Sequence, residues 1–199
     1  MCLFLTASVN GQDVSAKPVK VSVYYEALCP DSINFIRNQL WPSYQSIKEI
    51  MDVDLVAYGK ATHRRQDGKV LFECQHGPDE CKGNKMQACA LKLYPKESAI
   101  AFVKCVMTRR RPHEAGETCA RQLKLEFSPL DSCTSGTEGD EYLALLGDRT
   151  HNLSPKLNFV PWINLDDKHD DDKQWESLRD LTRVVCDAYN STSKPSGCP

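Results

Sequence analysis

The sequence has no C-x2-C pair, although it contains ten cysteines in 199 residues. Paired cysteines at that spacing are typical of structural zinc sites, so the sequence predicts no metal site. The formal net charge is only −2, which gives no reason to expect nucleic acid or an anionic membrane surface as a partner. No stretch approaches the ~18 consecutive apolar residues that a membrane-spanning helix needs, so no membrane span is predicted.

Cysteines are abundant but widely spaced, which indicates an oxidising compartment, where they form disulfides. Eight of them make an even set that predicts up to four structural disulfides, with the pairing left open. These are Cys74, Cys81, Cys89, Cys105, Cys119, Cys133, Cys186 and Cys198. Two glycosylation sequons, at Asn152 and Asn190, agree with this location. We therefore expect a protein that is secreted or resident in the endosomal or lysosomal lumen.

The chain organisation predicts one main domain, at residues 18–190. Residues 1–17 include the apolar stretch MCLFLTASVNGQ and are expected to be a signal-peptide remnant or a disordered N-terminus. Residues 191–199 are expected to be a tail, loose unless Cys198 ties it down. Inside the main domain, residues of about 61–155 are predicted to form a helical insertion that holds six of the cysteines.

Hydrophobic patterning gives the elements of this domain. A buried strand is predicted over 19–25, a helix over about 31–49 that Pro42 should kink, and a second strand over 51–60. The strand–helix–strand order favours a parallel pair of strands. Further helices are predicted around 79–93, 97–110, 116–124 and 138–147, then an extended segment over 157–167 and a closing helix over 173–189.

Cys29 follows the first strand and is followed by Pro30, which suits the first position of a helix. Unpaired N–H groups at a helix start favour the thiolate, the attacking species in disulfide exchange, although the neighbouring Asp31 opposes it. Ser32 stands where a disulfide oxidoreductase usually has its second cysteine. Its hydroxyl can donate a hydrogen bond to the thiolate, but it cannot resolve a mixed disulfide.

Two other features bear on Cys29. The even count of the remaining cysteines favours a free thiol, but a Cys2–Cys29 disulfide satisfies the parity equally well. Pro161, with Val160 before it, is a candidate for a cis-proline that presents a substrate backbone opposite the thiol. A proline in an edge strand explains the same residues equally well.

The segment CQHGPDECKGNKMQAC, from Cys74 to Cys89, fits the pattern C-Q-H-G-x2-E-C-x2-N-x4-C at every specified position. It closely resembles the signature of the gamma-interferon-inducible lysosomal thiol reductase family. From the residues alone, Cys81 and Cys89 are expected to pair elsewhere, Gly77 to adopt an unusual backbone conformation, and Glu80 and Asn84 to brace the helix start. His76 is either a base or ligand, or a polar side chain that fixes a loop.

The resemblance implies an α/β fold: a thioredoxin-like core with a disulfide-bonded helical insertion. It also implies reduction of disulfides in unfolding proteins, in acidic endosomes or lysosomes. No bound cofactor is expected, and the reductant is expected to be an external small thiol. The family's paired catalytic cysteines map onto Cys29 and Ser32, so the second thiol is missing. The sequence therefore leaves two hypotheses open: an oxidoreductase that acts through a single cysteine, or a non-catalytic binding module for unfolded or partner proteins.

Overall fold

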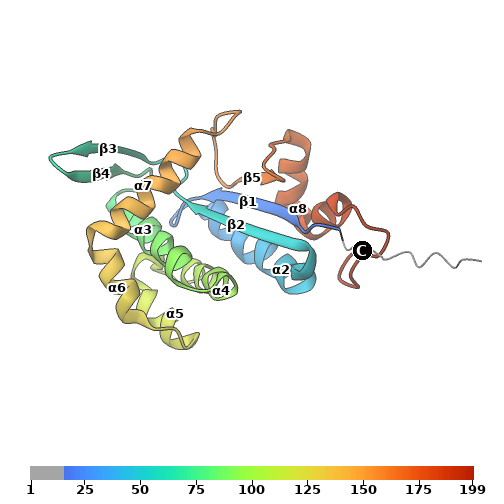
Figure 1. The fold of residues 1–199 in the computed structure, drawn as a ribbon, viewed down its shortest axis with the longest axis horizontal. Coiled ribbons are helices and arrows are strands. Elements are labelled where there is room, and N and C mark those ends of the chain that lie inside the picture. Colours follow the sequence, from blue (N-terminus) through green and yellow to red (C-terminus); the bar gives the residue numbers. More distant parts are fainter. Residues whose placement is uncertain (1–15) are drawn as a thin grey trace, which may run out of the picture.

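A computed structural model describes residues 16–199, so the predicted signal remnant lies almost wholly outside the described residues. Its centre is a three-stranded sheet with the order β2-β1-β5 (Figure 1). β1 (Val19–Tyr25) is the middle strand, with β2 (Met51–Ala57) parallel and β5 (Trp162–Leu165) antiparallel to it. The predicted first strand and parallel pair are confirmed, and β2 ends before 60 because a turn begins at Tyr58.

Both faces of β1 are covered, although one of them carries the polar residues Lys20 and Ser22, which hydrogen-bond to Asp167 and Asp54. Val21, Val23 and Tyr25 belong to the main core, whereas Tyr24 packs with Trp162 in a smaller cluster on the opposite face. Successive side chains of a strand point to opposite faces, so the valines of β1 share the face on the main core while Lys20, Ser22 and Tyr24 share the other face.

The crossover from β1 to β2 is helical almost throughout. It comprises α1 (Pro30–Phe35), a π-helical turn η1 (Ile36–Leu40), α2 (Trp41–Ile47) and a 3-10 turn η2 (Lys48–Ile50). Pro42 lies in the first turn of α2, directly after the π-helical turn. Proline has no N–H to donate to the preceding turn, and the irregularity predicted there takes the form of this wider turn.

The predicted helical insertion is present and also contains a hairpin. Its elements are β3 (Thr62–Gln66), β4 (Lys69–Glu73), α3 (Pro78–Leu93), α4 (Lys96–Met107), η3 (Pro112–Glu114), α5 (Gly116–Gln122), α6 (Phe127–Ser135) and α7 (Thr137–His151). Figure 1 shows its helices gathered beside β2, with the hairpin projecting at the far end. β3 and α6 were not predicted, because THRRQ has no apolar residue and FSPLDSCTS is rich in serine and contains a proline.

The closing helix is α8 (Asp171–Ala188), which contacts β5 and the helices of the crossover. We expected Trp175, Leu178, Leu181, Val185 and Ala188 to share one apolar face. That expectation is wrong for Trp175, which is 53% exposed, and for Ala188, which is also exposed, whereas Leu181 is fully buried. Asp180 has a non-helical backbone (φ −151°) and separates the two halves of α8, so a single helical periodicity does not run through both.

One hydrophobic cluster joins the sheet, the crossover helices, the insertion and α8. Phe35 from the crossover, Phe102 from the insertion and Leu181 from α8 are all buried in it. The insertion therefore shares its core with the sheet. None of the helices formed by residues 16–199 combines the length and apolarity that crossing a membrane requires.

Candidate active site

Cys29 lies between the end of β1 and the start of α1, where it is the N-cap residue and Pro30 is the first helical residue. Its carbonyl accepts the first helical hydrogen bond, from Ile33 N at 3.0 Å. The side chain is 7% exposed, and within residues 16–199 Cys29 is the one cysteine that forms no disulfide. The structure therefore places a free thiol at the strand–helix junction, while Cys2 lies outside the described residues.

The other cysteines within the described residues form four disulfides. They are Cys74–Cys81, Cys89–Cys133, Cys105–Cys119 and Cys186–Cys198. The first three lie entirely within the insertion, and Cys81 and Cys89 each pair elsewhere, as expected. The fourth ties the C-terminal tail to α8.

Ser32 is fully buried one helical turn after Cys29. Its Oγ accepts a hydrogen bond from the backbone N–H of Glu26, with 3.4 Å between the two atoms. A hydroxyl has one donor and two acceptor positions, so Ser32 can still donate a hydrogen bond. Its place in the site is thus partly structural, since it holds the backbone at the end of β1.

Pro161 follows a cis peptide bond, Val160–Pro161. β5 begins directly after it, and the antiparallel pairing places Trp162 opposite Tyr24, near the end of β1 that leads to Cys29. Gln174 on α8 holds this segment on both sides. It donates to Pro161 O at 3.0 Å and accepts from Ile163 N at 2.7 Å. The proline segment is therefore fixed at the edge of the sheet from which the thiol emerges.

A pocket of about 290 Å³ lies between α1 and the proline segment. Its lining residues are Asp31, Asn34, Phe35, Phe159, Val160, Pro161, Trp175 and Leu178. Phe159 and Trp175 were not predicted from the sequence as residues of this pocket. The only signal in the sequence was the closeness of Phe159 to Pro161.

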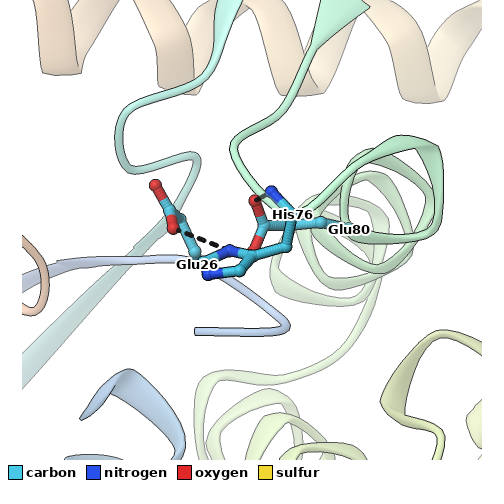
Figure 2. A group of neighbouring side chains, drawn as sticks. All are labelled: Glu26, His76 and Glu80. Atoms are coloured by element: carbon cyan, nitrogen blue, oxygen red, sulfur yellow. Dashed lines mark hydrogen bonds and ion pairs between the residues drawn. The ribbon is translucent and has the colours of Figure 1, made fainter. Parts of the chain in front are cut away.

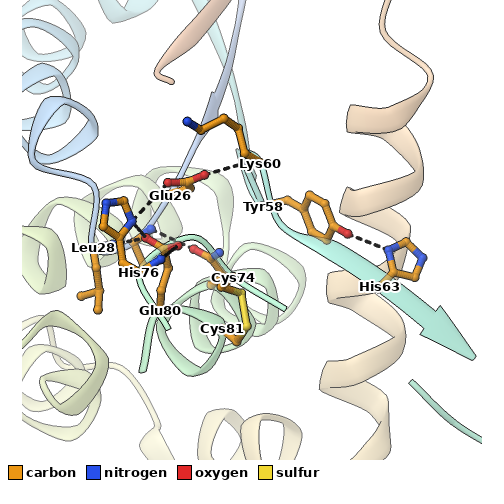
Figure 3. The surroundings of a disulfide bond; sticks show 11 residues. Glu26, Leu28, Tyr58, Lys60, His63, Cys74, His76, Glu80 and Cys81 are labelled. Carbon is orange, nitrogen blue, oxygen red and sulfur yellow. Dashed lines mark hydrogen bonds and ion pairs between the residues drawn. A yellow bond between two sulfur atoms is a disulfide. The ribbon is translucent and has the colours of Figure 1, made fainter. Parts of the chain in front are cut away.

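The signature residues of α3 hold the loop that presents Cys29. Asn84 Oδ1 accepts from Ala27 N at 2.8 Å, and Glu80 Oε2 accepts from Leu28 N at 3.3 Å. A Cβ on Gly83 would lie 2.8 Å from the Cβ of Ala27, so the close approach of helix and loop requires glycine there. Figure 3 shows Glu80 and Leu28 beside the Cys74–Cys81 disulfide.

These contacts revise the predicted roles of Glu80 and Asn84. Glu80 does brace the helix start, because its Oε1 accepts from His76 N at 3.1 Å. Asn84 does not, because its acceptor is used by the Cys29 loop. Gly77, the N-cap residue of α3, has the unusual backbone that we expected, with φ +82°.

Glu26, His76 and Glu80 form a polar cluster beneath this loop (Figure 2). His76 Nδ1 lies 2.6 Å from Glu80 Oε2 and 3.4 Å from Glu26 Oε2, and both glutamates are fully buried. Burial raises the pKa of Glu26 above its ordinary value, and the Glu80 carboxylate adds to this. The backbone N–H of Lys60, at 2.8 Å, and His76 oppose it.

Within residues 16–199 this cluster is the one group whose ligand atoms lie close enough together to hold a metal ion, all within 4.8 Å of one another. Glu80 already accepts hydrogen bonds from His76 N and from Leu28 N of the Cys29 loop, whereas the buried Glu26 Oε2 has no hydrogen-bond partner. Sequence reasoning missed Glu26. The His76 side chain lies against the two carboxylates. This position is nearer to the predicted role of fixing a loop than to that of a base or ligand.

Asn152 and Asn190, the two predicted glycosylation sites, are both exposed. Asn152 directly follows α7, and Asn190 follows the end of α8 by two residues. Their side chains are therefore open to modification, and glycosylation stays a prediction.

Most of the chain is similar to known proteins. Residues 20–123 match the family model described as gamma interferon inducible lysosomal thiol reductase. The chain is 35% identical over 187 residues to the gamma-interferon-inducible lysosomal thiol reductase of Carassius auratus, covering 92% of this chain and 73% of that protein. It is 33% identical to the protein of the same name from Mus musculus, covering 91% of this chain and 72% of that protein.

The fold is similar to that of the crystal structure of Chlamydia trachomatis DsbA. The two share 13% sequence identity with a TM-score of 0.58, over 94% of this chain and 96% of that chain. The likeness supports the thioredoxin-like core with a disulfide-bonded helical insertion that the sequence predicted.

Proposed function

Because the chain belongs to the gamma-interferon-inducible lysosomal thiol reductase family and is a thiol–disulfide oxidoreductase, we propose that it reduces protein disulfides through Cys29 alone. One observation carries this proposal: a free Cys29 at the start of α1 with a buried Ser32 three residues on. No second thiol is available at that position to complete a dithiol cycle.

The reaction then needs thiol from outside the protein. The Cys29 thiolate attacks one sulfur of a substrate disulfide, forms a mixed disulfide and releases the other substrate sulfur as a thiolate, which takes a proton from solvent. One external thiol attacks the Cys29 sulfur, releases the second substrate thiol and leaves its own residue on Cys29. A second external thiol regenerates Cys29 and departs as the oxidised small disulfide, so two small thiols are consumed for each substrate disulfide.

Ser32 and the proline segment have supporting roles in this proposal. Ser32 holds the backbone of Glu26 and has a hydroxyl proton free to stabilise the Cys29 thiolate. Val160 and cis-Pro161 line the pocket beside α1 and present a backbone edge to the substrate chain. No bound cofactor enters the cycle.

The place of action is proposed to be a secretory or endosomal/lysosomal lumen. Four disulfides and two exposed sequon asparagines support it, because both features belong to oxidising, lumenal environments. The proposed partners are disulfide-containing proteins and a small thiol reductant.

An insulin-reduction assay at pH 5 with excess small thiol tests the mechanism. Cys29→Ala should remove the activity, whereas Ser32→Ala should retain part of it. Acid quenching and alkylation should trap a substrate disulfide-bonded to Cys29 in the wild type. In Ser32→Cys the added thiol should release the substrate, so this adduct should no longer accumulate at limiting external thiol. Activity that survives Cys29→Ala contradicts the proposal.

The second candidate is a non-catalytic binding module of the same fold. The exposed Asp31 in the first turn of α1 favours it, because a carboxylate near Cys29 disfavours the thiolate. This candidate predicts that neither the wild type nor Ser32→Cys reduces insulin, while unfolded protein still binds to both.

A further inference from the structure

An exposed aromatic pair lies beside the proline segment. The rings of Trp175 and Phe159 are stacked, with centroids 5.4 Å apart and an interplanar angle of 9°. Phe159 also contacts the buried Trp162, at 5.3 Å between centroids, so the pair is anchored to the core. Trp175 is 53% exposed, which leaves a large apolar surface in water at a fixed position.

This pair forms one wall of the pocket next to the thiol. The opposite wall carries Asp31, Asn34 and Phe35 from α1, the helix that begins directly after Cys29. Val160 and Pro161 complete the pocket between them. The volume of about 290 Å³ is at the lower end of ligand pockets, ~300–1,000 Å³, so it suits one bulky side chain of an extended polypeptide.

The rim of the pocket is acidic. Asp31 lines it, and Asp171 and Asp172 precede Trp175 by four and three residues on α8, which places them on the same side of the helix. All three aspartates are exposed. Lys173 is paired with Glu176 at 2.8 Å, and His169 Nε2 lies 3.2 Å from Asp171. Arg179, four residues after Trp175, is the other base on this half of α8, so the three aspartates still outnumber the unpaired bases of α8 at the rim. The field at the rim therefore favours a cationic group and disfavours an anionic one.

We propose that this pocket binds an aromatic or large aliphatic side chain of the substrate polypeptide, followed or preceded by a basic residue, beside the disulfide that Cys29 attacks. The proposal rests on the proposed thiol exchange and adds a side-chain preference to it: a bulky apolar residue with a basic neighbour, close to the cysteine under attack.

The test measures binding apart from redox chemistry. Three labelled peptides contain a cysteine and, beside it, one of the pairs Lys-Phe, Lys-Ala or Glu-Phe. Lys-Ala and Glu-Phe each differ from Lys-Phe at one position. Binding of each peptide to the Cys29→Ala protein is measured by fluorescence anisotropy. The Lys-Phe peptide should bind roughly tenfold more tightly than Lys-Ala, as expected for burying one aromatic ring against another. The Glu-Phe peptide should bind more weakly than Lys-Phe.

Trp175→Ala in the same background should abolish the preference for phenylalanine. Leu145→Ala is the matched control, because Leu145 is 58% exposed on α7 and does not line this pocket. Asp172→Lys, which leaves the apolar wall intact, should reverse the preference between Lys-Phe and Glu-Phe. Equal binding of Lys-Phe and Lys-Ala, or a preference that survives Trp175→Ala, overturns the proposal.

Turnover of bis(2-hydroxyethyl) disulfide, which has no side chain for the pocket, is measured separately on protein with Cys29 intact. If the wild type does not reduce this small disulfide, the proposed thiol chemistry is wrong, but the binding result is unaffected. Leu145→Ala should match the wild type on both substrates, whereas Trp175→Ala should slow turnover of the Lys-Phe peptide more than turnover of the small disulfide; that result supports both proposals.

Discussion

Asn84 accepts a hydrogen bond from the backbone amide of Ala27, with 2.8 Å between Oδ1 and N, across 57 residues of sequence. Ala27 is two residues before Cys29, so this bond fixes the loop that presents the thiol. Glu80, one helical turn earlier on α3, holds the next amide, that of Leu28. The signature motif therefore acts on the site by positioning its backbone.

Replacing Asn84 tests this positioning role. Asn84→Ala leaves the Ala27 N–H buried without an acceptor, which should cost about 1–3 kcal/mol in the free energy of unfolding. Denaturant unfolding measures that loss, and the rate at which iodoacetamide alkylates Cys29 should change with it. Asn38→Ala is the control, because Asn38 is exposed and bonds only to Asn34. Equal stability of the two variants would contradict the role.

Ser32→Ala should affect both the loop and the thiol. The variant loses the acceptor for Glu26 N, which should reduce the free energy of unfolding by about 1 kcal/mol. It also loses the hydroxyl proposed to stabilise the thiolate, so alkylation of Cys29 at pH 5 should be slower than in the wild type. The exposed Ser128 provides the control, and Ser128→Ala should alkylate at the wild-type rate.

Chelation should leave the protein unchanged, because His76 and Glu80 hydrogen-bond each other, Glu80 also accepts from Leu28 N, and Glu26 Oε1 accepts from Lys60 N. Dialysis against EDTA should alter neither the melting temperature nor insulin reduction. The metal content of the purified protein, measured by mass spectrometry, accompanies the assay. A fall in melting temperature on chelation that added zinc reverses would show that the cluster holds a metal ion.

The sequence predicted the elements whose patterns are local. β1 is short and rich in valine and tyrosine, and α1 begins at a proline, so both could be placed from a few neighbouring residues. The insertion was predictable from its helical periodicity and clustered cysteines, and the signature indicated the family.

The contacts that build the site were not predictable in the same way. The bond from Ala27 to Asn84 depends on how α3 packs against β1, and no local pattern encodes it. The sequence around Glu26 indicates only an acidic residue in a loop, yet this residue is fully buried against His76. Trp175 was wrongly assigned to the apolar face of α8. The helical periodicity used for that prediction assumes one unbroken helix, and Asp180 interrupts it.

Glu26 should make the protein more stable in acid than at neutral pH. Burial, with the Glu80 carboxylate adding to it, raises the folded-state pKa of Glu26 above its ordinary 4.5, despite the opposing Lys60 N–H and His76. An acid with a raised folded pKa binds its proton more tightly in the folded state. Its contribution is therefore fully present below about pH 4.5 and is lost as the pH rises through the folded pKa.

Glu26→Gln cannot ionise, so it should narrow the difference in melting temperature between pH 5 and pH 7.5. The glutamine Oε1 can still accept from Lys60 N, which preserves the hydrogen bond while removing the charge. Glu117→Gln changes an exposed glutamate on α5 and should leave the wild-type difference intact. If Glu26→Gln keeps the full difference, another group governs the pH dependence. If the difference narrows, the buried carboxyl beside the Cys29 loop adapts this fold to an acidic compartment.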